Sequence, residues 1–520
     1  MSSTMRPFRF SARIWLAGLT SGALLGCLQI ATPPAVRPSV PALADPPTTS
    51  PSASLGRNAA LTLLEPRTDA LEVTTTPGRS LTLIASAAAV GNPPLRFVVS
   101  PLGELSTYRW TLQGLNRPVP RLESPPEMPY TSRFTVHRDL PAGPVVSRRL
   151  AQALPAREPG STEAFWVNTG DSNADSDRKQ VCQLRRVSAH ALLYVDQQAK
   201  PVSDAQLDQL VTEWESRIYP RLTAVFGQPA SPGVDGEPRI FIVLSPAVDN
   251  WGKEKGLMGY FWSRDAIPRG GGHSNQKEVL FMTDQLFDRP KLTSYGTLAH
   301  EFQHLLNFSR KSARLGYRLV EDTWLDEGLS MYAMELAGYG LPAGDYHIAK
   351  DLRGFQENPS AYSLTSWNEN PNGFAYGQSY LFVRYLVDRY GSEIVAEILH
   401  DNRAGVACLS ALLAKRNTTF ANHFRAWTIA NFLNGTPMAE TDEYRYKNLS
   451  LKGLYRSSTG LEDIILPGFQ AAERPSDEVE LALKPWGAAY LAFSHRHEGP
   501  WRLKLPAGTV NRLLGATIVP

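Results

Sequence analysis

Two histidines four positions apart, His300 and His304, stand in the apolar run TLAHEFQHLLNF, with Glu301 directly after the first of them. In a helix, four residues turn the chain by about 400°, so both imidazoles would project from nearly the same side, one turn apart. Two imidazoles placed in this way can bind one zinc ion, and the neighbouring glutamate can reach a water molecule on that ion. The alternative is an ordinary core helix whose polar side chains have partners inside the protein.

A catalytic zinc ion usually takes three protein ligands and keeps a further position for water. The stretch EDTWLDEGLSMYA supplies a candidate, Glu327, which lies 23 positions after His304 and leaves room for a turn and a second, antiparallel helix. Thr323 and Asp326 fit a capping box at the start of that helix, whereas Glu327 has no such structural role. The sequence therefore predicts one zinc ion held by His300, His304 and Glu327.

The motif HEFQH followed by WLDEG resembles the gluzincin clan of zinc metallopeptidases. The words around it, such as WLDEGLSMYA and GLMGYFWSRD, resemble more narrowly the hyicolysin family of bacterial secreted neutral metallopeptidases, over roughly 160 to 435 and more weakly to 500. This resemblance implies cleavage of protein or peptide substrates, with Glu301 as general base and acid. The family usually has asparagine before the third ligand, where this chain has Asp326, which would add negative charge beside the metal or compete as a ligand.

The related zinc aminopeptidases imply a further participant, a tyrosine that opens a helix and donates to the substrate oxyanion. In those enzymes another Tyr and a Leu follow nine residues later, and Tyr376 here precedes Tyr385 and Leu386 at the same offsets. His347 and His400 are alternative donors, and Tyr376 could also be a helix-start aromatic that only packs against the core.

The same aminopeptidases carry a Gly-x-Met-Glu-Asn stretch whose glutamate holds the free amino group of the substrate. The corresponding run GLMGYFWS has Met258 and Gly259 but no glutamate, so the resemblance favours an endopeptidase. Two alternatives stay open: a zinc aminopeptidase, and a catalytically inactive, peptidase-like surface binding protein.

The elements that must position these residues change type along the chain. Five strand-like runs lie between about 161 and 283: AFWVNT, HALLYVD, RIFIVLS, LMGYFWS and EVLFMTD. A helical segment near 203–226 lies among them. Helices then take over, at about 292–310, 323–338, 374–399 and 419–434. A β-rich half (161–291) followed by a helical half (292–435) predicts an α+β, gluzincin-like peptidase domain over 161–435, with a cleft between the halves.

Alternating apolar runs separated by Pro and Gly predict small β-rich modules on both sides of this domain. One covers 58–160 and is a possible pro-region, and the other covers 436–520.

The N-terminus has the features of an export signal. Three arginines precede an apolar stretch that is too short to span a bilayer and ends ALLGC, which resembles the bacterial lipobox. We therefore expect a lipoprotein signal peptide (1–26), a lipid on Cys27 and a Pro/Ser/Thr-rich tether (27–57), and the alternative is a plain secretory signal. These features predict an exported lipoprotein on the cell surface or outer membrane, or else a periplasmic or secreted protein.

The composition of the 520 residues limits the other partners. A hydrophobic share of 42%, a charged share of 20% and a net charge of +3 indicate a folded protein and give no support for a nucleic-acid partner. Membrane contact is expected only through the lipid anchor. Cys182 and Cys408 could form a disulfide in an oxidising compartment or remain two buried thiols.

Overall fold

The computed structural model describes residues 157–493 with short gaps, and strand segments between 52 and 101 and between 501 and 519. The predicted signal peptide 1–26, Cys27 and most of the predicted tether 27–57 lie outside the described residues. Among the helices that are described, none combines the length and the apolar character needed to cross a membrane.

A six-stranded mixed sheet forms the β-rich half of the predicted peptidase domain, in the order β10-β11-β9-β8-β7-β6. Its strands are β6 (Thr162–Val167), β7 (Arg178–Val187), β8 (Ala191–Asp196), β9 (Ile240–Leu244), β10 (Gly259–Phe261) and β11 (Val279–Met282). Strands β8, β9 and β11 run parallel, and β8 and β9 are buried along their whole length because both faces of the sheet are covered. The predicted strands are confirmed, and β7 is additional.

A continuous helical segment connects β8 to β9, as predicted near 203–226. It consists of α1 (Asp204–Glu213), a π-helical turn η4 (Trp214–Ile218) and α2 (Tyr219–Phe226). Ser203 and Gln206 form a capping box at its start, and Trp214 lies in the core against Phe302. The segment covers the face of the sheet toward the helical half.

The helical half follows β11. Its helices are α3 (Lys291–Asn307) with the π-helical turn η8 (Phe308–Ala313), α4 (Thr323–Ala337), α5 (Tyr346–Glu357), α6 (Ala375–Tyr390), α7 (Glu393–His400), α8 (Gly405–Ala414) and α9 (Phe420–Leu433). The helices expected near 292–310, 323–338 and 419–434 are confirmed. The single helix expected at 374–399 is wrong, because Gly391 at φ +82° separates α6 from α7. Helices α5 and α8 were not predicted.

The strands near the two ends of the chain share two sheets. The first has the order β1-β2-β18-β4-β16-β14, the second β15-β5-β17-β3, and β12 and β13 form a separate ribbon. The strands are β1 (Ser52–Leu55), β2 (Ala59–Leu64), β3 (Ala70–Val73), β4 (Leu81–Ala87), β5 (Leu95–Pro101), β12 (Lys452–Tyr455), β13 (Ile464–Pro467), β14 (Ala472–Glu473), β15 (Glu478–Leu481), β16 (Ala488–Phe493), β17 (Trp501–Lys504) and β18 (Leu513–Val519).

This pairing corrects two boundaries drawn from the sequence. The modules 58–160 and 436–520 are not separate units, since β18 lies between β2 and β4, and β17 lies between β3 and β5. The tether expected over 27–57 also ends earlier, because Ser52–Leu55 pairs with β2. Local patterns reveal strands but not which distant strands they pair with.

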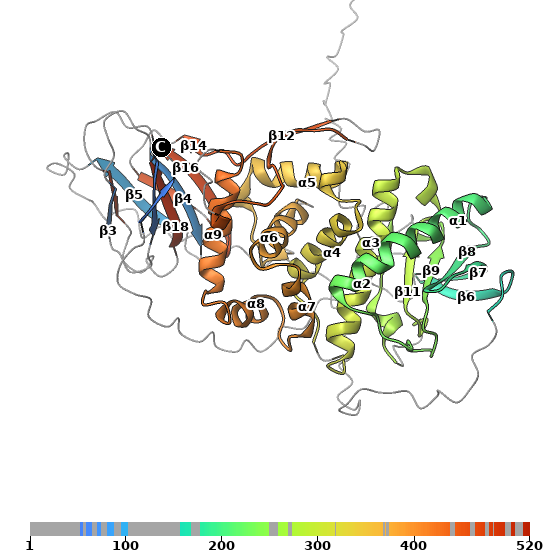
Figure 1. Cartoon of the computed structure of the whole chain (residues 1–520). Coiled ribbons are helices and arrows are strands. Elements are labelled where there is room, and N and C mark those ends of the chain that lie inside the picture. The colour runs from blue at the N-terminus through green and yellow to red at the C-terminus, as the bar shows by residue number, and fades with distance from the viewer. Residues whose placement is uncertain are drawn as a thin grey trace, which may run out of the picture.

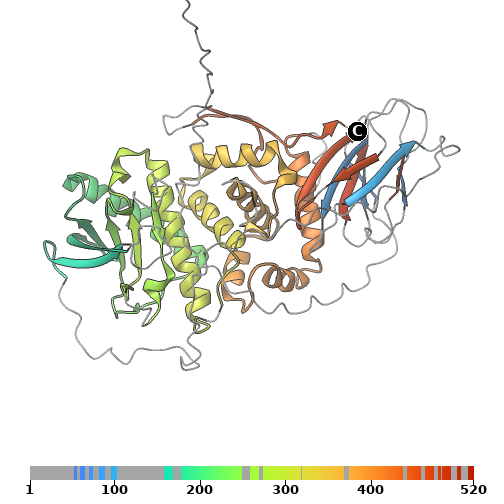
Figure 2. The same ribbon diagram turned by 180° about the vertical axis from the view of Figure 1, so that it is seen from behind.

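The three parts follow one another in space (Figure 1). The six-stranded sheet with α1 and α2 lies at one end, the helices α4 to α8 occupy the middle, and the shared terminal sheets lie at the other end beside α9. The view from behind shows the same order, with α3 between the first sheet and the helical part (Figure 2).

The two cysteines of the described residues, Cys182 and Cys408, are free and buried. The structure therefore has two buried thiols at these positions and not the disulfide that was the other possibility.

Candidate metal centre

Helices α3 and α4 bring the predicted ligands together. Helix α3 packs against β10 and β11 on one side and against α4 on the other. It is buried from Thr293 to Asn307, so its polar side chains face protein rather than solvent. Helix α4 packs on α6 so closely that a Cβ atom at Gly328 would lie 2.7 Å from the carbonyl oxygen of Ser379. The position of Glu327, next to Gly328, is therefore fixed from two sides.

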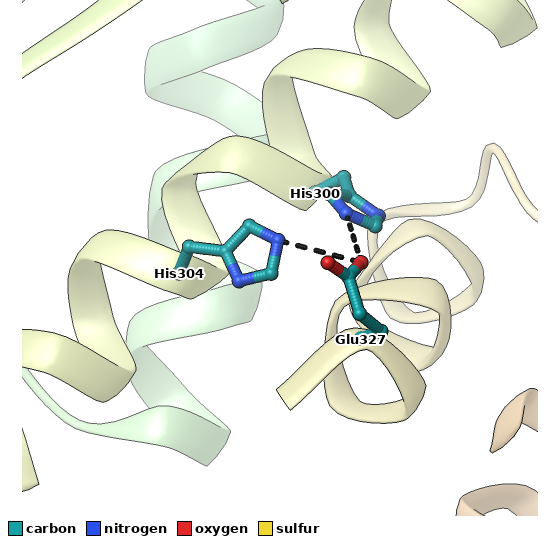
Figure 3. Close-up of side chains that lie close together, drawn as sticks. All are labelled: His300, His304 and Glu327. Carbon is teal, nitrogen blue, oxygen red and sulfur yellow. Dashed lines mark ion pairs between the residues drawn. The ribbon is translucent and has the colours of Figure 1, made fainter. Parts of the chain in front are cut away.

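The three candidate ligands converge on one point (Figure 3). Nε2 of His300 lies 3.2 Å and Nε2 of His304 lies 3.7 Å from Oε2 of Glu327. One ligand atom from each side chain falls within 4.8 Å of the others, and all three residues are buried. Among the described residues, no other group of three or more His, Cys, Asp or Glu side chains lies close enough together to hold a metal ion.

The hydrogen bonding of these atoms fits a metal ion. Three buried atoms make no hydrogen bond within the described part of the chain. They are the two ring nitrogens of His300 and Oε2 of Glu327. Buried polar atoms normally have partners, because leaving one without costs about 1–3 kcal/mol. Two imidazole nitrogens and a carboxylate oxygen are also the donor set that zinc prefers.

The electrostatics point the same way. Burial, and then the neighbouring charge of His304, lower the pKa of His300 well below its ordinary value, so its ring is neutral and able to bind a metal. Burial raises the pKa of Glu327 to about 8 against the opposing charge of His304, and the negative charges of Asp326 and Glu327 raise the pKa of His304 to about 9 despite its burial. A divalent cation between these groups would offset that accumulation of negative charge.

Asp326 is neither a helix cap nor a competing ligand in this structure. Helix α4 has Asp322 at its N-cap without a side-chain capping bond, so the predicted capping box is wrong. Instead, Oδ2 of Asp326 lies 2.8 Å from Nδ1 of His304, and Oδ1 accepts a hydrogen bond from Nδ2 of Asn307. Asp326 therefore contacts the ring nitrogen of His304 that is turned away from Glu327.

The carboxylate of Glu301 is held by the edge strand of the sheet. The backbone N–H of Phe261, in β10, donates to its Oε2 at 2.9 Å. Glu301 is fully buried and follows His300 directly in α3, so it lies beside the proposed metal without being part of the ligand set.

A comparison with protein families matches residues 192–430 to the family described as Peptidase M30. We refer to this matched range as the M30 domain. The matched range contains α3, α4 and the start of α6, and hence His300, Glu301, His304, Glu327 and Tyr376.

A characterised relative supports this assignment. The chain is 30% identical over 212 residues to the neutral metalloprotease ShpI of Staphylococcus hyicus. The alignment covers 38% of this chain and 46% of the relative, so the chain spans about half the length of the protein it matches. The predicted resemblance to hyicolysin-type metallopeptidases is thereby confirmed over the M30 domain.

Tyr376 lies near the metal centre of the M30 domain. It follows the first residue of α6 and is half-buried, with its ring centroid 6.4 Å from that of His300. His400 is exposed at the end of α7, where Nδ1 meets the carbonyl oxygen of Ala396 and Nε2 meets Arg310. Of the three predicted donors, Tyr376 is the one whose ring contact with a candidate ligand, His300, is established.

His347 is half-buried at the start of α5. Burial, followed by the positive charges of Lys350 and Arg289, lowers the pKa of His347 to about 4. Its ring is therefore neutral at physiological pH.

Three features of the centre escaped the sequence prediction. The contact of Asp326 with His304 joins residues 22 positions apart, and no local pattern reports it. Asn307 was detectable in principle, because it follows His304 by three positions and so lies on the same face of α3. The backbone donor from Phe261 carries no side-chain signal at all.

Proposed function

We propose that this protein is a zinc-dependent metalloendopeptidase that hydrolyses peptide bonds in proteins or peptides outside the cytoplasm. The observation that carries the proposal is the convergence of His300, His304 and Glu327, buried and within 4.8 Å of one another, with Glu301 adjacent. The M30 match supports the same activity, although the relative it resembles is aligned over less than half of its length.

His300, His304 and Glu327 would hold the zinc ion. When bound there, zinc supplies a Lewis acid that polarises the scissile carbonyl and lowers the pKa of a bound water molecule from about 16 to about 7. The helices α3 and α4 keep the ligands in place, and Asp326 would accept the Nδ1 proton of His304, which leaves the Nε2 lone pair to bind the ion.

Glu301 takes the role of proton carrier. Its carboxylate accepts the proton of the attacking water as the new carbon–oxygen bond forms, and returns it to the departing amine as the peptide bond breaks. The hydrogen bond from Phe261 fixes one carboxylate oxygen at 2.9 Å, so the carboxylate is oriented before the substrate arrives.

Tyr376 is proposed as the donor to the carbonyl oxygen, on which negative charge develops during the attack. A phenol placed there stabilises the transition state by about 3 kcal/mol. Its location at the start of α6, with its ring close to that of His300, supports this role.

Export and anchoring belong to the same proposal. The lipobox-like end of the signal peptide supports lipidation of Cys27, which would hold the M30 domain at a membrane surface by a short tether. A mass measurement of the mature protein extracted from membranes would show a diacylglyceryl-modified Cys27 if this holds, and an unmodified N-terminus if it does not.

The test of the activity uses a blocked, internally quenched peptide and an unblocked aminoacyl substrate. We expect cleavage of the blocked peptide, its loss on chelation and its return with zinc. Glu301→Gln should keep the metal and lose a factor of about 10²–10⁴ in turnover. Faster cleavage of the aminoacyl substrate would indicate an aminopeptidase, and no cleavage of either by the zinc-loaded protein would refute the proposal.

A further inference from the structure

The loop before α6 contacts the proposed oxyanion donor. The ring of Trp367 packs edge to face against that of Tyr376, with centroids 4.9 Å apart and an interplanar angle of 88°. The same tyrosine ring has its centroid 6.4 Å from that of His300. Both Trp367 and Tyr376 are half-buried, so the indole limits the side-chain rotation of a tyrosine that is not enclosed by the core.

Hydrogen bonds join the described residues of this loop, Ser363, Ser366 and Asn370. The backbone N–H and carbonyl oxygen of Ser363 bond to the side-chain amide of Asn370 at 2.9 and 3.1 Å. The Oγ atom of Ser363 accepts the N–H of Ser366 at 3.0 Å. These contacts set the backbone that leads into Trp367.

The C-terminal segment Lys484–Gly487 holds the same loop from outside. Oγ of Ser363 donates to the carbonyl oxygen of Pro485 at 2.6 Å, and the N–H of Leu364 donates to that of Trp486 at 3.1 Å. A Cβ atom at Gly487 would lie 2.9 Å from the carbonyl oxygen of Tyr362, so the two backbones touch.

The segment itself is anchored on both sides. The buried ring of Trp486 packs edge to face against Phe420 and Phe424 of α9, with centroids 4.6 and 5.2 Å away. Directly after it, β16 pairs with β4 in the terminal sheet. The shared terminal sheets are therefore connected to the metal centre through the C-terminal segment, the loop, Trp367 and Tyr376.

We infer that Trp367 is a positioning residue for Tyr376, and that the C-terminal segment Lys484–Gly487 holds the loop that carries it. The inference rests on the proposed function, since it assigns Trp367 an effect on catalysis only through Tyr376. A donor to a developing oxyanion must be held in place before the reaction, because displacement by about 1 Å can cost about 100-fold in rate.

The first experiment measures kcat and KM on the blocked peptide for Trp367→Ala and Trp367→Phe. We expect Trp367→Ala to lower kcat by about 10-fold or more with KM and zinc content nearly unchanged, because the ligands are not touched. Trp367→Phe should recover most of the rate, since a phenyl ring can still pack edge to face.

The matched control is Trp166→Ala, since Trp166 is also half-buried and stacks on His273 at 4.1 Å in the other half of the domain. Its kcat should stay within about twofold of wild type.

A double-mutant cycle separates positioning from a general structural effect. If Trp367 acts through Tyr376, then Trp367→Ala added to Tyr376→Phe should cause almost no further loss of kcat. An equal loss in both backgrounds, or wild-type kcat in Trp367→Ala, would overturn the inference.

A binding measurement gives a readout that does not depend on turnover. The dissociation constant of a phosphonate peptide, which mimics the tetrahedral intermediate, should rise in Trp367→Ala and Tyr376→Phe alike. Ser363→Ala, which removes the hydrogen bond to Pro485 together with the one from the N–H of Ser366, should show a smaller rise, whereas an unchanged constant would contradict the role of the C-terminal segment. If wild type itself cleaves nothing, the proposed function fails; if wild type is active and these variants match it, the inference alone fails.

Discussion

At the scale of single residues, Asp326 distinguishes this centre from the pattern of the family it resembles. Its carboxylate lies 2.8 Å from Nδ1 of His304 and also binds Asn307, so it orients the imidazole and supplies negative charge behind it. A carboxylate behind a metal-bound histidine raises the basicity of the ligand and fixes its tautomer. An asparagine at this position would keep the hydrogen bond and lose the charge.

Asp326→Asn therefore removes the charge and keeps an acceptor for Nδ1 of His304, while it also changes the contact with Asn307. We expect the zinc dissociation constant to rise by about 10- to 100-fold, because the imidazole becomes a weaker ligand while its orientation is retained. Competition with a chromophoric chelator measures this constant. Asp345→Asn is the matched control, since Asp345 is equally buried but caps α5 through the N–H of Ile348 at 2.9 Å. Equal zinc affinity in Asp326→Asn and wild type would exclude the charge effect.

The candidate ligands were predictable from the sequence for a physical reason. Residues at i and i+4 of a helix share a face, so His300 and His304 required no knowledge of tertiary structure. Glu327 required only that a second helix return beside the first. Trp367 and Phe261 were not predictable, because their contacts depend on how separate elements pack.

At the scale of elements, strong periodicity predicted the helices that carry the centre, and weak or interrupted periodicity accounts for the errors. Helix α8 is nearly all apolar, so no face distinguishes it from a strand, and the many charges of β7 hide its alternation. The break at Gly391 depends on a single positive φ angle.

Helix α9 contains a titratable group whose burial links stability to pH. His423 packs against the rings of Phe382, Tyr385 and Tyr390, at centroid distances of 5.4, 5.1 and 5.4 Å. Burial, and then the charge of Arg389, lower its pKa to about 3. Between about pH 6.5, the value in an unfolded chain, and pH 3, the unfolded state therefore binds a proton that the folded state does not.

The free energy of unfolding should consequently fall as the pH drops below about 6.5, by up to about 1.4 kcal/mol per pH unit from this group. His423→Phe keeps an aromatic ring in the site and removes the titration. Urea denaturation at pH 7 and pH 5 should show a smaller pH-dependent loss in the variant, by about 2 kcal/mol. Identical losses in the two proteins would show that His423 is protonated in the folded state.

At the scale of the whole molecule, the two ends of the chain depend on each other. Strand β18 pairs with β2 and β4, and β17 pairs with β3 and β5. Within the described residues, the C-terminal strands β15, β17 and β18 have their partners only among N-terminal strands. Such long-range pairing leaves no trace in local sequence, which is why two separate modules were predicted.

Removal of residues 1–101 should therefore destabilise the protein rather than release a mature enzyme. We expect the melting temperature to fall by about 10 °C or more and aggregates to appear in size-exclusion chromatography, because β17 and β18 lose their partners. Removal of residues 1–50 is the control, since it takes away no described strand. A shortened chain with wild-type melting temperature would restore the prediction that 58–160 is a removable pro-region.

The central claim is that His300, His304 and Glu327 hold one zinc ion on which peptide hydrolysis depends. The most direct measurement is the zinc content of purified wild type and Glu327→Ala, taken together with cleavage of the blocked peptide. The account predicts one zinc ion per wild-type chain, and loss of both tight zinc binding and activity in the variant. If Glu327→Ala bound zinc as tightly and cleaved as fast as wild type, the centre described here would not be the active site.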